Sequence, residues 1–394
     1  MEDNKNKKIV LLGSTGSIGK HTLNVCRRLK IKVEALACNK NVDLLYQQIK
    51  EFKPKYVAMS DKTSADRLID RLKTEPELKD IEVFSGDDGV SQLAQLKCDR
   101  IVMAIIGFAA LNPLITAIKA GQKIAMANKE TIVALGDLVI DMVEEYGAEL
   151  LPVDSEPSAV WQCLANNSNP INKVFLTASG GPFKDVPKSK FPEITVADAL
   201  NHPVWAMGNK ITIDSATMMN KGLEMIEISH LFQIEPEQIE IVVHPESIIH
   251  SMVEFNDGAV IAQMGIPDME LPIQYAITFD KRLPMPDKPK LNFSKLSQIT
   301  FFEPDFEKFL SLKLAYYAKR EAGAMPAVLN AADEIAVAAF MQEKVRFDQI
   351  PLIIEVVLNN FVNHPLKNAR SIDDILAADL WAREETEHLV QKFN

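Results

Sequence analysis

The chain has 394 residues, of which 47% are hydrophobic and 25% are charged, and its formal net charge is −11. This length exceeds what one ordinary hydrophobic core holds, so two or three domains are expected. The acidic balance argues against a nucleic acid or an anionic membrane as the main partner, although a local basic site could still bind a small phosphate.

Targeting signals are not evident in the sequence. No apolar stretch approaches the length of a membrane span, and the polar start "MEDNKNKK" lacks the apolar region of a secretory signal. The four cysteines lie far apart without C-x-x-C spacing, which is typical of reduced thiols in a cytoplasmic protein.

Residues 1–152 alternate short apolar runs, such as "KIVLLG", "KVEALAC" and "RIVMAI", with helix-length amphipathic stretches. This alternation predicts an α/β domain with a Rossmann-like, doubly wound parallel sheet. Ligands of such sheets bind at the carboxyl ends of the strands.

From residue 153 the regular alternation of strand-like and helix-like segments ends. The runs "KVFLTASGG", "KITID" and "IEIVVHP" and the hairpin "SMVEFNDGAVIAQMG" predict a second α/β domain with a mixed sheet over 153–279. A proline-rich linker is expected over 280–304 and a helical bundle over 305–394. The loop "NHPVWAMGN" has the composition of a mobile lid, over 199–209, although spacing alone favours a static loop covering a buried Trp205.

A glycine turn follows the first predicted strand. In "KIVLLGSTGSIGKHTL", Gly13, Gly16 and Gly19 lead into the first helix, where backbone amides can approach a pyrophosphate. A purely structural turn is the alternative, and the position in the first βα unit favours a nucleotide. The second strand ends in "ACNKN" without an acid, so Lys40 could meet a 2′-phosphate, which favours NADPH over NADH. A solvated lysine explains the same residue about as well.

Two acids follow the last strand of this domain. In "LLPVDSEPSAVWQ", Asp154 and Glu156 flank Ser155, and either a helix cap or a metal ion would explain them. In extended backbone this spacing points both carboxylates to one side. Further on, Glu224 and Glu227 lie three residues apart and share one helical face. Three carboxylates around a single divalent ion would suit Mg²⁺ or Mn²⁺. Taken singly, the helix residues are better explained as a solvated face.

Phosphate-binding groups are also present. "TASGGPF" is a Ser-Gly-Gly turn after a strand, and "DSATMMNK" adds Ser215, Asn220 and Lys221. Hydroxyl and amide donors with one ammonium suit a phosphate, although each residue alone could be a cap or turn residue.

Together, "LGSTGSIG", "ANKE", "LLPVDSE", "SGGPF", "HPVWAMG", "DSATMMNKGLE", "HPESIIHSM" and "GIPDM" resemble the signature stretches of the 1-deoxy-D-xylulose 5-phosphate reductoisomerase family, in family order. The resemblance implies a nucleotide-binding domain, a catalytic α/β domain, a linker and a C-terminal bundle, in a homodimer. It implies an enzyme of isoprenoid synthesis that converts 1-deoxy-D-xylulose 5-phosphate to 2-C-methyl-D-erythritol 4-phosphate with NADPH and a divalent metal (Mg²⁺, Mn²⁺ or Co²⁺). A bacterial cytoplasm fits the lack of a targeting segment.

The resemblance also implies roles for individual residues. The metal ligands would be Asp154, Glu156 and Glu224, and the phosphate pocket would be Ser179, Ser215, Asn220 and Lys221. Lys129 and Ser155 would hold the substrate near the metal, as catalytic residues with Glu156 and His202, and the lid would contribute His202, Trp205, Met207 and Gly208. The cofactor would contact Gly13, Thr15, Gly16, Ser17, Ile18, Lys40, Asn41, Asn128, Lys129, Glu130, Met207, Gly208 and Met269.

Three positions depart from the family pattern. Asn39 and Ala178 replace common glycines, and Pro157 stands where a histidine is frequent. None of the three removes a metal ligand. Two alternatives to the enzyme are a non-catalytic NADP-binding sensor or scaffold of the same fold, and a simple dehydrogenase related only through its first domain.

Overall fold

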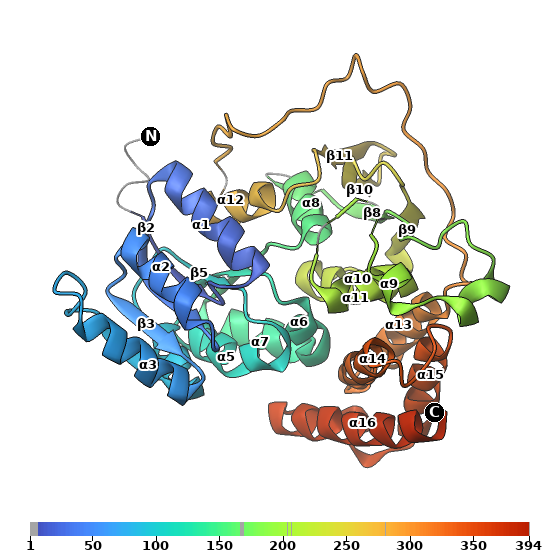
Figure 1. The fold of residues 1–394 in the computed structure, drawn as a ribbon. Coiled ribbons are helices and arrows are strands. Elements are labelled where there is room, and N and C mark those ends of the chain that lie inside the picture. Colours follow the sequence, from blue (N-terminus) through green and yellow to red (C-terminus); the bar gives the residue numbers. More distant parts are fainter. Residues whose placement is uncertain (1–6, 166–168, 203, 206, 280, 394) are drawn as a thin grey trace. The chain divides into compact units, whose positions relative to one another are not determined.

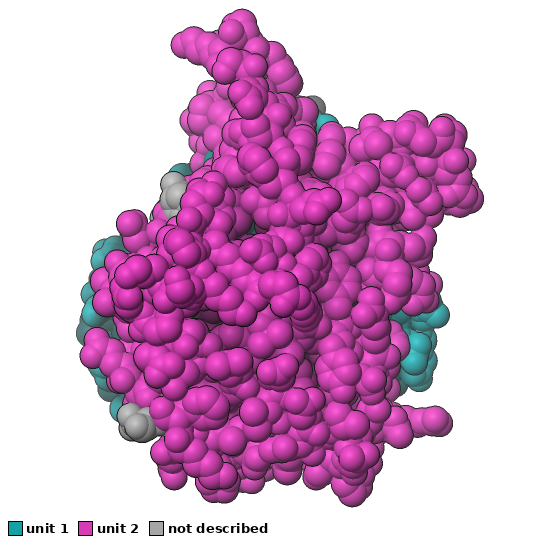
Figure 2. Space-filling view, turned by 90° about the vertical axis from the view of Figure 1, so that its right-hand side faces the viewer, with its two compact units in different colours: residues 1–131, 139–158, 268–285 teal, residues 132–138, 159–267, 286–394 magenta. Residues whose placement is uncertain are grey.

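The computed structural model describes residues 7–165, 169–202, 204–205, 207–279 and 281–393. The chain forms two compact units, which Figure 2 colours separately. Unit 1 consists of residues 1–131, 139–158 and 268–285, and unit 2 consists of residues 132–138, 159–267 and 286–394. Among the described residues, no helix is both long and apolar enough to cross a bilayer.

Unit 1 is built on a seven-stranded sheet in the order β4-β3-β2-β1-β5-β6-β7 (Figure 1). All its neighbouring strands are parallel, which confirms the predicted doubly wound fold. The chain order reverses between β1 and β5, the position where such sheets bind ligands. The strands are β1 (Lys8–Leu12), β2 (Lys32–Cys38), β3 (Tyr56–Met59), β4 (Glu82–Ser85), β5 (Arg100–Met103), β6 (Lys123–Met126) and β7 (Glu149–Pro152).

The helices of this region alternate with the strands. Helix α1 buries Leu23, Val25 and Cys26, whereas its last turn carries Arg27 and Arg28, which suit the negative end of the helix dipole. The helices are α1 (Ser17–Leu29), α2 (Val42–Phe52), α3 (Lys62–Lys73), α4 (Gly86–Leu93), α5 (Leu111–Lys119), α6 (Lys129–Leu135) and α7 (Asp137–Tyr146).

Helix α12 (Glu270–Thr278) returns to unit 1 and packs against α1. Its buried Glu270 accepts from Arg28 Nη1 at 2.7 Å and from Asn24 Nδ2 at 3.0 Å, and Arg28 also donates to Gln274. These charge-assisted bonds neutralise a carboxylate that burial alone would destabilise. The division into segments 1–152, 153–279, 280–304 and 305–394 stays a prediction. The compact units differ from this division because α12 belongs to unit 1 and not to the unit that contains most of residues 153–279.

Unit 2 contains the predicted mixed sheet, in the order β11-β10-β8-β9. Strand β8 (Ile171–Ala178) pairs antiparallel with β10 (Ile249–Phe255) and parallel with β9 (Ile239–Val243). Strand β11 (Val260–Met264) completes the predicted hairpin with β10, and Gly258 in its turn has φ +85°. Each residue of β11 is at least partly exposed.

The segment "KITID", expected as a strand, lies in helix α10 (Asn209–Thr217), so this prediction is wrong. Its β-branched residues favoured a strand, but Gly208 starts a helix and the buried Ile213 and Thr217 follow helical spacing. The other helices of this region are α8 (Ser155–Leu164), α9 (Val196–Ala199) and α11 (Met219–Phe232).

The C-terminal part of unit 2 consists of four long helices that pack together (Figure 1). Helix α14 is buried along most of its length and packs against both α15 and α16. Helix α11 joins the bundle where Gly222 approaches α13, since a Cβ at Gly222 would lie 2.5 Å from Ala315 Cβ. The bundle helices are α13 (Leu310–Glu321), α14 (Met325–Met341), α15 (Gln349–Phe361) and α16 (Ile372–Phe393).

The segment before the bundle is fixed to the outer edge of β9. Phe302 and Val243 exchange two backbone hydrogen bonds of 2.9 Å. The buried His244 donates from Nδ1 to Thr300 O at 2.9 Å, accepts at Nε2 from Ile248 N at 3.1 Å, and stacks on Phe301. His244 therefore holds the linker to the sheet.

We expect Gly13→Ala to destabilise unit 1 by about 2–4 kcal/mol, because the residue has φ +96° and its Cβ would lie 2.3 Å from Ala104 O. Thermal unfolding followed by circular dichroism measures the loss. Gly16→Ala is the matched control, since a Cβ there meets its nearest atom at 3.4 Å and φ is −74°. Equal melting temperatures for the two variants would contradict this account of the turn.

Candidate active site

The predicted cofactor turn lies between β1 and α1 of unit 1. The amides of Gly13 and Ser14 both donate to Ala37 O, at 2.9 and 2.8 Å, which fixes the turn against β2. Side chains are excluded at Gly13 by the backbone of Ala104. No side chain of the described residues caps α1 at Gly16, so the first amides of this helix can serve an anion. Thr15, Ser17 and Ile18 complete the turn.

For the other predicted cofactor residues of unit 1, the structure gives their exposure and their protein contacts. Lys40 is exposed, which is compatible both with contact to a 2′-phosphate and with a solvated lysine. Asn41 caps α2 by accepting from Leu44 N at 3.1 Å. Glu130 and Met269, at the starts of α6 and α12, are half-buried.

Asn128 is buried and its side-chain amide bonds to backbone groups. Its Nδ2 donates to Ile105 O at 2.7 Å and to Gly107 O at 2.8 Å, and its Oδ1 accepts from Thr131 N. The side chain thus holds the loop after β5 against the start of α6. Contact of Asn128 with a cofactor stays a prediction.

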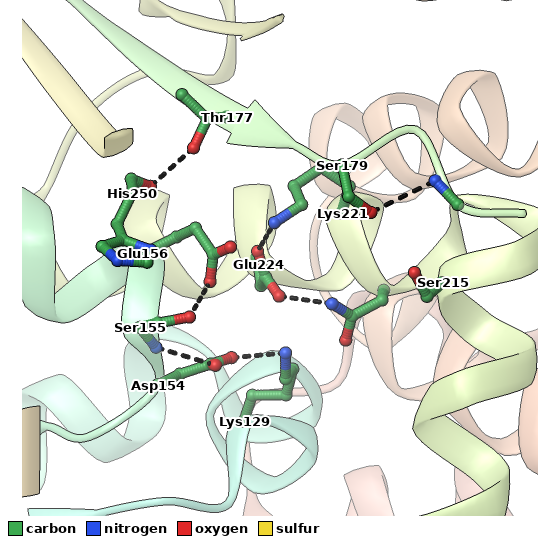
Figure 3. A network of polar contacts seen from close by, with 12 residues as sticks. Lys129, Asp154, Ser155, Glu156, Thr177, Ser179, Ser215, Lys221, Glu224 and His250 are labelled. Carbon is green, nitrogen blue, oxygen red and sulfur yellow. Dashed lines mark hydrogen bonds and ion pairs between the residues drawn. The ribbon is translucent and has the colours of Figure 1, made fainter. Parts of the chain in front are cut away.

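The two acids after β7 lie at the start of α8 in unit 1 (Figure 3). Asp154 Oδ1 accepts from Ser155 N at 3.0 Å, and Ser155 Oγ donates to Glu156 Oε2 at 2.6 Å. The nearly buried Lys129 forms an ion pair with Asp154 Oδ2. Carboxylate oxygens of Asp154 and Glu156 lie within 4.8 Å of each other, close enough for one cation to meet both.

The expected reason for this proximity is wrong. Glu156 lies in the first helical turn of α8, so the helix start, and not the alternation of an extended strand, brings the two carboxylates together. Pro157 is tolerated in this turn because the first amides of a helix need no intrahelical acceptor.

His202 joins the two serines of the predicted phosphate pocket, and all three belong to unit 2. Its Nε2 lies 3.3 Å from Ser179 Oγ, after β8, and 3.1 Å from Ser215 Oγ, in α10. Its Nδ1 accepts from the amides of Val204 and Trp205, at 3.2 and 2.9 Å. Since Nδ1 must offer a lone pair to these amides, Nε2 carries the proton of the neutral ring and faces the two hydroxyls.

Burial and, secondarily, the positive charge of Lys221 lower the pKa of His202 from its usual value. Both causes oppose a second proton on the ring. The ring is therefore a neutral hydrogen-bond donor at neutral pH.

Glu224 in α11, predicted as a metal ligand, is 1% exposed and is bonded to two residues of the predicted phosphate pocket (Figure 3). Asn220 Nδ2 donates to Glu224 Oε1 at 2.5 Å, and Lys221 Nζ lies 2.5 Å from Glu224 Oε2. Lys221 and Glu227 are also buried. The interpretation of Glu224 and Glu227 as a solvated helix face is therefore wrong.

The predicted lid is described at most of its positions, whereas Pro203 and Ala206 lie outside the described residues. Trp205 is half-buried, so the expectation that it is buried beneath the loop is wrong, whereas the mobile lid stays a prediction. The ring centroid of Trp205 lies 6.3 Å from that of His250. Met207 is half-buried and Gly208 is exposed.

A buried charge cluster follows the lid. Lys210 in α10 pairs with Asp214 at 2.6 Å and with Asp333 of α14 at 2.8 Å, and both aspartates are almost fully buried. This cluster ties the helix that carries Ser215 to the C-terminal bundle.

Sequence reasoning missed three features near these residues. His250, beside Trp205, lies in the quoted stretch "HPESIIHSM", but no pattern singled it out. The loop after β5, whose backbone packs against Gly13 and whose Ile106 is 83% exposed, carries no motif of its own. The pairing of Lys210 with Asp333 joins distant segments that no local spacing connects.

Models of one family match the chain at residues 9–136, 150–232 and 264–385, under the descriptions 1-deoxy-D-xylulose 5-phosphate reductoisomerase and its C-terminal domains. A protein of that name from Acetivibrio thermocellus is 51% identical over 391 residues, which cover 98% of this chain and 99% of the relative. The chain belongs to the 1-deoxy-D-xylulose 5-phosphate reductoisomerase family. A member from Caldanaerobacter subterraneus subsp. tengcongensis is 49% identical over 96% of this chain and 98% of its own length.

Solved structures of the family have the same fold. The reductoisomerase from Zymomonas mobilis in complex with NADPH is 41% identical, with a TM-score of 0.90 over 98% of this chain and 99% of that one. A reductoisomerase in complex with NADPH, fosmidomycin and magnesium is 37% identical, with a TM-score of 0.91 over 98% of each chain. The α/β fold class and the family identified from the sequence are confirmed, and both expected cofactors are found in structures of this family.

The matches also bear on the alternatives. Because the family models continue to residue 385, the chain is not a simple dehydrogenase related only through its first domain. Nothing in the comparisons favours a non-catalytic sensor.

We expect the pKa of His202 to lie below the usual value of about 6.5, because burial and Lys221 both disfavour the charged form of its ring. Nitrogen-15 NMR of labelled histidine, followed through a pH titration, would show this lowered pKa and the Nε2-protonated tautomer of the neutral ring. A pKa at or above the usual value, or a neutral ring with its proton on Nδ1, would contradict the assignment. Lys221→Met should move the pKa of His202 upward.

Proposed function

We propose that this chain catalyses the metal-dependent rearrangement and NADPH-dependent reduction of 1-deoxy-D-xylulose 5-phosphate to 2-C-methyl-D-erythritol 4-phosphate, a step of non-mevalonate isoprenoid synthesis. The observation that carries the proposal is the close pair of carboxylates Asp154 and Glu156 beside Lys129, in a member of the reductoisomerase family. A sensor that had lost the chemistry would have no need of these charges.

The metal ligands in this proposal are Asp154, Glu156 and Glu224. The donors suit a hard divalent ion, since all are carboxylate oxygens, which Mg²⁺ and Mn²⁺ prefer. Asp154 Oδ2 is buried and, among the described residues, is compensated by the charge of Lys129, so this anionic oxygen has capacity for a cation. Magnesium in solved structures of relatives supports this assignment.

NADPH would lie on the glycine turn of unit 1, with the pyrophosphate at the start of α1. The backbone cradle at Gly13, where any Cβ would collide with Ala104, supports close approach of a ligand. The remaining contacts assigned to the cofactor are Gly16, Thr15, Ser17, Ile18, Lys40, Asn41, Asn128, Lys129, Glu130, Met207, Gly208 and Met269.

The substrate phosphate would be held by Ser179, Ser215, Asn220 and Lys221, which meet shared partners within unit 2. His202, as a neutral donor, and Trp205 would close over the substrate from the lid. Contacts to a phosphate remote from the reacting carbons supply binding energy that can be used for closure and exclusion of water.

When bound, the divalent ion supplies Lewis-acid polarisation of the substrate carbonyl, and NADPH supplies the hydride. The residues Lys129 and Ser155 orient the reacting end of the substrate. Ser155 Oγ is itself directed by Glu156 Oε2, and the Lys129 ammonium is held by Asp154, so each donor has a fixed position before substrate arrives.

We also propose a homodimer in a bacterial cytoplasm. The exposed outer strand β11 supports self-association, since Val260 and Ile261 are 49% and 43% exposed at the free side of its hairpin. Bacterial relatives and four free cysteines support a reducing compartment. The functional segments in this proposal are residues 1–152, 153–279 with the lid at 199–209, 280–304 and 305–394.

We expect Glu224→Gln to abolish metal-dependent NADPH oxidation with the sugar phosphate, by a factor of about 10³ or more, because a neutral amide replaces one anionic ligand. Absorbance of NADPH measures the rate, and a thermal melt verifies the fold. Glu237→Gln, at an exposed carboxylate paired with Arg320, is the control and should keep full activity. Retained turnover in Glu224→Gln would refute the ligand set.

Ile261→Lys should convert the dimer to monomers, because a charge on β11 opposes burial of this strand in an interface. Light scattering coupled to size exclusion measures the mass. Lys79→Glu, at a solvent-exposed position of unit 1, is a charge-change control that should leave the mass unaltered. A wild-type chain that is already monomeric would contradict the proposed assembly.

A further inference from the structure

All four side chains assigned to the phosphate are bonded either to a residue of the predicted lid or to a proposed metal ligand. Ser179 and Ser215 share His202 Nε2, whereas Asn220 and Lys221 share the carboxylate of Glu224. Figure 3 shows the contact of Lys221 with Glu224. The pocket is therefore linked to the lid by one pair of contacts and to the proposed metal ligand by the other.

The contacts of Glu224 are short and buried. Both its oxygens have a donor at 2.5 Å, and Glu224 and Lys221 are 1% and 6% exposed. A carboxylate at this depth is stable only with such partners, and their ammonium and amide neutralise and solvate it. The donors that stabilise Glu224 are the same ones that a phosphate needs.

We infer that Asn220 and Lys221 are specificity-determining residues that make a high-affinity metal site depend on the substrate phosphate. This inference rests on the proposed function, in which Glu224 is a metal ligand. A phosphate that takes the amide of Asn220 and the ammonium of Lys221 withdraws both donors from Glu224. The carboxylate then has oxygen lone pairs for a divalent ion.

The two ligands favour each other's binding through charge. Phosphate alone draws the Lys221 ammonium away from the buried carboxylate of Glu224, which is costly. A divalent ion alone must share Glu224 with an ammonium that its own charge repels. With both bound, Lys221 faces the phosphate and Glu224 faces the ion, so each ligand favours the other.

A consequence for substrate choice follows. A sugar with the same reacting carbons but without a phosphate leaves Glu224 paired to Asn220 and Lys221, so it does not recruit the ion tightly. Selection for the phosphorylated substrate then acts on the chemical step as well as on binding.

The test is titration of the full-length chain with Mn²⁺, followed by electron paramagnetic resonance of the free ion, with and without saturating inorganic phosphate. We expect phosphate to tighten Mn²⁺ binding about tenfold, and Mn²⁺ to tighten phosphate binding by the same factor, as linkage requires. Equal Mn²⁺ affinity in the two conditions would overturn the inference.

Two matched variants separate this exchange from simple attraction between a phosphate and a nearby cation. Asn220→Ala and Ser215→Ala each remove one neutral donor of the pocket, but only Asn220 contacts Glu224. Asn220→Ala should tighten Mn²⁺ binding without phosphate and reduce the effect of phosphate. Ser215→Ala should weaken phosphate binding and leave both the Mn²⁺ affinity without phosphate and the tenfold effect unchanged. Identical behaviour of the two variants would overturn the inference.

Lys221→Gln is a second variant in case Asn220→Ala does not fold, and it should likewise lose most of the effect of phosphate. Retention of the full effect would overturn the inference. Failure of the proposed function has a different signature: Glu224→Gln would bind Mn²⁺ as the wild type does, under both conditions. In that case the ion does not use Glu224, and the inference falls with the ligand set.

Discussion

The need to compensate buried carboxylates shapes this molecule more than any other constraint. Glu224, Glu270 and Asp333 are all nearly inaccessible, and each lies beside a cation: Lys221, Arg28 and Lys210. A charge buried without a partner would cost several kcal/mol, a large part of the roughly 5–15 kcal/mol that stabilises a typical domain. Each pairing therefore fixes the position of the helix that carries it.

These ion pairs differ in the structural elements that they connect. Glu270 docks α12 onto α1 and so places Met269 at the start of α12 within unit 1. Asp333 reaches from the bundle to the helix that carries Ser215. Glu224 instead lies among donors that a ligand could recruit. The same electrostatic requirement thus serves rigid support in two places and exchangeable contacts in the third.

The sequence predicted the unit 1 sheet well because its strands are continuous apolar runs between turn signals. This pattern is typical of strands in a parallel sheet that is covered on both faces. It predicted the glycine turn because Gly13 has to adopt positive φ close to another backbone. It failed for residues 210–214, where β-branched side chains pack on a helix, and for the burial of Glu224 and Glu227, because no local pattern distinguishes a solvated acid from one with distant partners. His250 was missed for a similar reason, since its relation to Trp205 exists only in three dimensions.

The bonds between Phe302 and Val243 have a consequence for higher-order assembly. The four-stranded sheet of unit 2 has β9 at one side and β11 at the other, and the linker already occupies hydrogen-bonding groups on the β9 side. A second copy that pairs by sheet extension would therefore meet β11 with its own β11, an arrangement with twofold symmetry that closes upon itself. Head-to-tail stacking into open-ended filaments would require the hydrogen-bonding groups of Val243 on β9, which the chain already bonds to its own Phe302.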